Sequence, residues 1–163
     1  MKQSIEQRLI AQPDALTHLL FGLTEEQVVS RPLPDKWSIY ENLVHLARYH
    51  EIFGQRVTLI LEGNTPVFPA YRADDDEGFY AWQKKSYYEV MNDFEKDRKD
   101  LNTFILSLNN EQLKLTGKHA VYGLTMNIEG WTEFFLLHEA HHFLTILKLT
   151  ARLGNERIFG LSE

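Results

Sequence analysis

Apolar residues recur at intervals of three and four along most of this 163-residue sequence, and this periodicity constrains the fold more than any other feature. Residues at that spacing share one face of an α-helix, which can be buried against other helices. We expect four long helices, at residues 4–21, 38–62, 77–108 and 127–153, and no strand. The sequence therefore predicts an all-α, up-and-down style four-helix bundle with one longer crossover, as a single domain over residues 1–163.

Several residues mark where the predicted helices begin and end. Ser38 and Glu41 have the spacing of a capping box, in which each side chain bonds the backbone N–H of the other residue. Asn127 is a favourable N-cap for the last helix, and Gly154 is a favourable residue just past its end. Pro13 is a candidate kink in the first helix.

Composition excludes several classes of function. The 17 basic and 23 acidic side chains give a formal net charge of −6, which disfavours nucleic acid as a partner. No apolar run approaches the roughly 20 residues that span a bilayer, so we expect no membrane insertion. The chain has no cysteine, which excludes disulfides and thiolate metal sites. The absence of cysteine also fits a reducing compartment, and residues 1–10 lack the apolar core of a signal peptide, so we expect a cytoplasmic protein.

The last predicted helix places histidines on its apolar face. Residues of this stripe step by four, three, four, three and four: Trp131, Phe135, His138, His142, Thr145 and Leu149. His138 and His142 are one turn apart, with Cβ atoms about 5–6 Å from each other, so both imidazoles can reach one ion. Two packed imidazoles are the alternative, but partners for all their ring nitrogens are scarce on an apolar face. The spacing therefore predicts a metal site.

A third ligand is expected from the facing helix, where His45 and His50 are the candidates. Periodicity alone slightly favours His50, which shares a stripe with Leu46, Phe53 and Val57. His45 lies toward the edge of a broader apolar arc. Either histidine could instead be packed at a helix–helix interface, so spacing leaves the choice open.

Residues 138–142 also match the H-E-x-x-H pattern of zinc metalloproteases, in which the glutamate, here Glu139, is the general base. Those enzymes take a third ligand from downstream, and only Glu156 and Glu163 are available there as acidic residues. No edge strand is evident that would align a peptide. We therefore interpret the match as coincidental.

The ordered set of motifs resembles a known family, the DinB-like (DinB/YfiT-like) superfamily, and more narrowly its DinB_2 branch. The resemblance covers nearly the whole chain after Pro32. It rests on residues 36–46 (KWSIYENLVHL), Arg56, Pro66, Pro69, Phe79, His119, Gly123, Leu124, Thr125, His138 and His142.

This resemblance to a family named after a bacterial gene implies a four-helix bundle that binds a divalent metal, usually zinc or nickel, through three histidines. Carried over by position, the ligands are His45, His138 and His142. Two positions depart from the family pattern: relatives often have glutamate at the position of His50, and many have glutamine at that of Thr145. The second departure weakens any transfer of detailed activity. The family name does not imply DNA binding.

Three protein ligands leave open positions on a metal, as in catalytic sites. We therefore expect a metal-dependent enzyme acting on a small molecule, either a thiol S-transferase that uses a low-molecular-weight thiol, as the resemblance implies, or a hydrolase. The alternatives are a non-catalytic metal-binding or stress-response protein and an interaction module without metal. The high aromatic content also makes a homodimer plausible. Candidate pocket residues are Glu41, Tyr49, His50, His119, Tyr122 and Glu139, although Glu41 is already explained as a capping residue and Glu139 as a solvated one.

Overall fold

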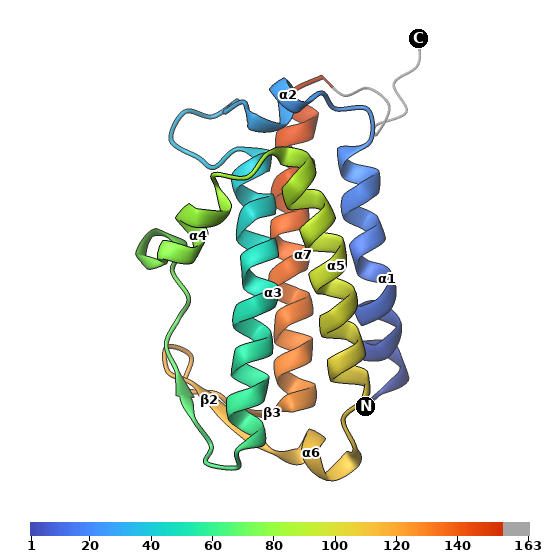
Figure 1. Cartoon of the computed structure of the whole chain (residues 1–163), viewed down its shortest axis with the longest axis vertical. Coiled ribbons are helices and arrows are strands. Elements are labelled where there is room, and N and C mark those ends of the chain that lie inside the picture. The colour runs from blue at the N-terminus through green and yellow to red at the C-terminus, as the bar shows by residue number, and fades with distance from the viewer. Residues whose placement is uncertain (155–163) are drawn as a thin grey trace.

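Four long helices packed side by side dominate the computed structural model of the chain, which describes residues 1–154 (Figure 1). They are α1 (Gln3–Leu20), α3 (Ile39–Leu61), α5 (Tyr87–Leu106) and α7 (Ile128–Arg152). The predicted all-α four-helix bundle is therefore confirmed. The last nine residues of the expected single domain, including Glu156 and Glu163, lie outside the described residues. No helix within residues 1–154 is both long and apolar enough to cross a membrane.

The long helices run in two directions. In Figure 1, α1 and α7 run upward while α3 and α5 run downward. Helix α7 packs against α1 and α3, and α5 packs against the same two helices from the other side. Because α3 and α5 are parallel, the chain between them must return along the length of the bundle. This predicted longer crossover contains β1 (Val67–Phe68), the 3-10 turn η1 (Ala73–Asp75) and α4 (Glu77–Trp82).

Capping residues begin the helices where the sequence predicts. Ser38 Oγ accepts a hydrogen bond from the Glu41 backbone N–H at 3.1 Å, and the Glu41 carboxylate accepts one from the Ser38 N–H at 2.8 Å. Asn127 caps α7 by accepting from the Gly130 N–H. A further capping box begins the short helix α2 (Glu25–Val29). Pro13 lies inside α1, which is continuous around it.

The core has two clusters of buried apolar side chains, one toward each end of the bundle. The cluster at the α2 end includes Leu16, Leu43, Phe94 and Ile146, and the other includes Leu9, Phe53, Leu101, Trp131 and Phe135. Along α3, the boundary falls between Ala47 and Tyr49. The candidate site histidines lie at this boundary, where polar side chains interrupt the apolar core.

The helix predicted at residues 77–108 is wrong in its extent. It is broken into α4 and α5, and Ser86 begins α5 with a capping box to Glu89. The apolar periodicity continues across the break, so it does not reveal that the chain changes direction there. A short helix, α6 (Asn110–Lys114), follows α5.

The expectation of no strand is also wrong. A small sheet with the order β1-β2-β3 closes the lower end of the bundle in Figure 1, formed with β2 (Thr116–His119) and β3 (Thr125–Asn127). Strand β2 is parallel to β1, pairing His119 with Phe68, and antiparallel to β3. Gly117 in β2 allows the strand to lie close to the side chains of Ile60 in α3 and Phe68 in β1. A Cβ at this position would lie 2.9 Å from side-chain atoms of both residues.

Candidate metal centre

Three histidine side chains from two helices meet inside the bundle. Helix α3 supplies His45, and α7 supplies His138 and His142, one turn apart. One ring nitrogen from each lies within 4.8 Å of the others, and the Nε2 atoms of His45 and His138 are 3.1 Å apart. Two ligands 2.0–2.1 Å from a tetrahedral zinc ion would be about 3.3 Å apart. Within residues 1–154, this is the only group of three or more histidine or acidic side chains with metal-binding geometry.

Asn42 fixes the orientation of one of these rings. Its Nδ2 donates to the Ser38 carbonyl at 2.8 Å, which leaves Oδ1 facing Nδ1 of His142 at 2.9 Å. An amide oxygen only accepts, so His142 carries its proton on Nδ1 and keeps a lone pair on Nε2. Sequence analysis missed Asn42, although its position three residues before His45 places it on the same face of α3.

Burial keeps all three imidazoles neutral. It lowers the pKa of His45 to about 3, with a further contribution from His138, and that of His138 to about 4. The pKa of His142 falls to about 2, mainly through burial and then through His45. Aromatic rings surround the group: Trp37 lies 5.2 Å and Tyr71 5.3 Å from His45, between ring centroids. Neutral imidazoles have the lone pairs that a metal requires.

The donor set also indicates which cations would fit. Imidazole nitrogen suits zinc, nickel, copper and iron, whereas calcium and magnesium prefer oxygen. The Nδ1 atoms of His45 and His138 are buried and have no hydrogen-bond partner among the described residues. A cation held by the Nε2 atoms would leave these two Nδ1 atoms unpaired, so the fit of a metal rests on the facing Nε2 atoms and on the imidazole donor set.

A pocket of about 130 Å³ reaches the histidine group at His138. Three of the predicted pocket residues, Tyr49, His119 and Tyr122, line it. Arg56, which also lines the pocket, was not predicted as a site residue. Its position two turns after Tyr49 on α3 is a signal that could have found it, because residues seven apart share a helix face. Tyr71 belongs to the crossover, and helical periodicity could not have placed it here.

The other three predicted candidates lie elsewhere. Glu139, which sequence analysis interpreted as solvated, is fully buried and accepts hydrogen bonds from Arg98 at 2.6 Å and Gln12 at 2.7 Å. His50 lies beside it, with Nε2 3.6 Å from the Glu139 carboxylate, and does not join the three histidines. The Glu41 carboxylate caps α3 and pairs with Arg31.

The position of Glu139 bears on the protease motif. Burial alone would raise its pKa, but its partners His50 and Arg98 bring that pKa below the usual value. Glu139 is therefore an ionised partner of a buried arginine. A metalloprotease needs this carboxylate beside the metal-bound water. The H-E-x-x-H match is thus coincidental, as sequence analysis interpreted it.

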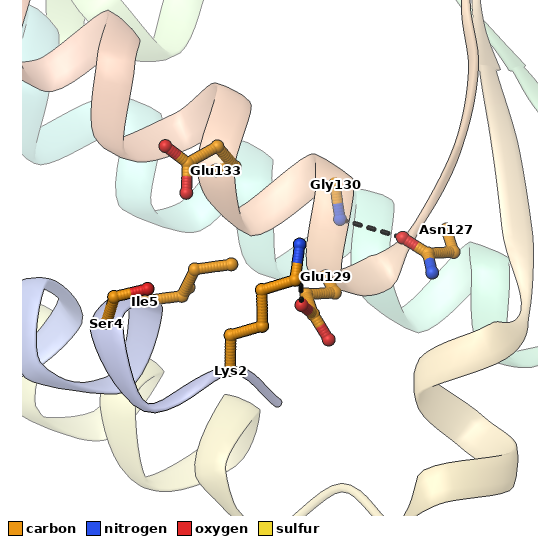
Figure 2. A pocket seen from close by; sticks show the side chains of 7 residues that line it. All are labelled: Lys2, Ser4, Ile5, Asn127, Glu129, Gly130 and Glu133. Carbon is orange, nitrogen blue, oxygen red and sulfur yellow. Dashed lines mark hydrogen bonds and ion pairs between the residues drawn. The ribbon is translucent and has the colours of Figure 1, made fainter.

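A larger hollow of about 580 Å³ lies at the N-terminal ends of α1 and α7 (Figure 2). Its charged groups are already paired: Lys2 Nζ lies 3.8 Å from the Glu129 carboxylate, and Glu133 pairs with Arg8 at 2.6 Å. The Gly130 N–H donates to Asn127. It contains no histidine. Arg56, His119 and His138 instead line the smaller pocket of about 130 Å³.

Comparisons with known proteins identify the family and the fold of the chain. Residues 8–146 match the family model of the DinB superfamily. A solved structure with a similar fold is YfiT from Bacillus subtilis, described as a probable metal-dependent hydrolase with an unusual four-helix bundle topology. The TM-score is 0.74 at 19% sequence identity, over 94% of this chain and 90% of that one, a likeness that shows the fold alone. No curated protein matches the chain. The family match covers well over half of the sequence, so the chain belongs to the DinB superfamily.

Proposed function

We propose that this protein is a metal-dependent enzyme acting on a small molecule, with His45, His138 and His142 as the ligands of one divalent cation. The observation that carries the proposal is the convergence of three neutral imidazoles beside a pocket that reaches His138. Three protein ligands are typical of catalytic sites, because structural zinc sites close the coordination sphere with a fourth. His50, the candidate fourth ligand, lies with Glu139 instead.

The chain's own residues would prepare the site. A zinc or nickel ion bound there would lower the pKa of a bound water or thiol and polarise a substrate oxygen. Asn42 holds His142 in the tautomer with Nε2 free. Trp37 and Tyr49 pack against the rings and keep bulk water away, while His119 and Tyr122 border the pocket through which a substrate would enter.

Hydrolysis is the reaction that we propose first, since YfiT is described as a probable metal-dependent hydrolase. Thiol S-transfer is the second candidate. Thiolate sulfur is a favoured zinc ligand, and the chain has no cysteine of its own to occupy the open position. A low-molecular-weight thiol could therefore bind there without competition from the protein.

A reaction screen on metal-loaded and chelator-treated protein tests the proposal. Ester and amide substrates probe water as the nucleophile, and a thiol with an electrophilic acceptor probes transfer. We expect turnover that is lost on chelation and restored by zinc or nickel, and that is absent in His138→Ala. His141→Ala is the matched control, because His141 is exposed and projects about 100° around the helix from the neighbouring ligand His142. Activity that survives chelation would contradict the proposal.

A further inference from the structure

Arg56 is a buried cation without an acidic partner. Its side chain is only 7% exposed, and no carboxylate of the described residues lies within ion-pair distance. Arg98, the other buried arginine within residues 1–154, is paired with Glu139 at 2.6 Å. Burial of an unpaired charge is strongly unfavourable, so a retained guanidinium of this kind calls for a partner that the described residues do not provide.

Neutral contacts hold the guanidinium in place. Nη1 donates to the Tyr49 hydroxyl at 3.2 Å, and Nη2 donates to the Pro69 carbonyl at 2.8 Å. The Arg56 guanidinium carbon lies 5.4 Å from the ring centroid of Phe68. Among the described residues, Nε makes no hydrogen bond. These contacts fix the guanidinium in position but use only two of the five N–H donors of arginine. The remaining donors are available to a ligand.

Arg56 and His138 line the same pocket, and Tyr49 links them. The Tyr49 hydroxyl accepts from Arg56, and its ring lies 4.3 Å from that of His138, between centroids. The pocket volume of about 130 Å³ corresponds to roughly four water molecules at about 30 Å³ each. That space suits a carboxylate on a short chain whose other end points to the histidines.

We propose that the small molecule used by this enzyme carries a carboxylate that binds Arg56 in the pocket beside His138. A planar carboxylate matches the guanidinium fork, and the single positive charge matches a monoanion. This inference rests on the proposed function for its role in catalysis, but anion binding at Arg56 can be tested in protein that contains no metal.

The first test compares propionate with propionamide, its neutral isostere, on metal-free protein followed by NMR. We expect propionate to shift the Arg56 Nε–H resonance and those of Tyr49 and His119, with an affinity about 10–100-fold above that of propionamide. Equal effects of the two probes, or no shift near Arg56 with propionate, would overturn the proposal. Because this comparison uses the unaltered chain, it does not depend on a variant that folds.

Variants then locate the binding site. Arg56→Gln should remove the preference for propionate, and Arg56→Lys should retain part of it, since lysine keeps the charge but lacks the fork. Arg152→Gln, at an exposed arginine near the end of α7, is the matched control and should behave as the unaltered protein. An unchanged preference in a folded Arg56→Gln protein would contradict the assignment.

A second arm separates this proposal from the metal centre. Protein loaded with Co²⁺ is titrated with 3-mercaptopropionate and with 2-mercaptoethanol, which has no carboxylate. We expect the carboxylate thiol to bind about 10–100-fold more tightly, and this advantage to disappear in Arg56→Gln. Failure of Co²⁺ to bind would refute the proposed function alone, whereas equal affinity of the two thiols would refute the role of Arg56.

Discussion

At the scale of single residues, the site depends on side chains that sequence spacing only partly reveals. His138 and His142 share a face because helix geometry fixes residues four apart. His45 and His50 are five apart, about 140° around the helix. Which of them faces α7 depends on how α3 is rotated in the bundle, and packing of the whole core decides that. For this reason, sequence spacing could not decide which of the two histidines is the third ligand, and only the family resemblance favoured His45.

Asn42 gives a prediction at this scale. Its Oδ1 accepts the Nδ1 proton of His142, so Asn42→Ala removes the group that fixes the ring and its tautomer. Loss of such a contact typically weakens metal binding about 10–100-fold. Zinc affinity measured by competition with a chromophoric chelator would show this. Asn64→Ala, at an exposed loop asparagine, is the control. The same affinity in both variants would mean that Asn42 has no role at the metal centre.

At the scale of elements, local signals placed helix starts well and helix breaks poorly. Capping residues act within one turn, which is why Ser38 and Asn127 could be recognised from sequence alone. Ser86 and Glu89 carry the same signal, but the apolar pattern continues across them and hid the break between α4 and α5. Strands of two to four residues are too short to show the alternation that identifies a strand.

The contact between Arg98 and Glu139 joins elements and predicts a stability effect. It links α5 to α7, and Arg98 also donates to the Leu9 carbonyl of α1. Removing one partner of a buried ion pair typically costs about 3–5 kcal/mol, because the other charge stays buried. We expect Arg98→Met to lower the free energy of unfolding in urea by that amount, and the added change Glu139→Gln to restore part of it. A cost for Arg98→Met below about 1 kcal/mol would contradict this interpretation.

At the scale of the whole molecule, periodicity and loop length were enough to predict the bundle and its longer crossover. They did not predict the parallel course of α3 and α5, since amphipathic faces do not specify which helices become neighbours. The bundle brings the middle of α3 against the middle of α7, and the histidines lie at this contact. The expected homodimer stays a prediction.

Stability of the metal-free protein should depend on pH through the buried histidines. Their folded pKa values, about 3 for His45, about 4 for His138 and about 2 for His142, lie below the unfolded value of about 6.5. Below pH 6.5 the unfolded chain therefore binds more protons than the folded one, and the free energy of unfolding falls with falling pH. Urea denaturation between pH 7 and 5 measures this. In His138→Gln the slope should be smaller; stability that stays constant or rises on acidification would contradict neutral, buried imidazoles.

Equilibrium dialysis of tag-free protein against Zn²⁺ tests the metal centre most directly. We predict about one ion bound per chain in the unaltered protein and in His141→Ala, and none bound at the same concentrations in His45→Ala or His138→Ala. Retention of the ion by both of these variants, or an unaltered protein that binds none, would contradict a cation held jointly by α3 and α7.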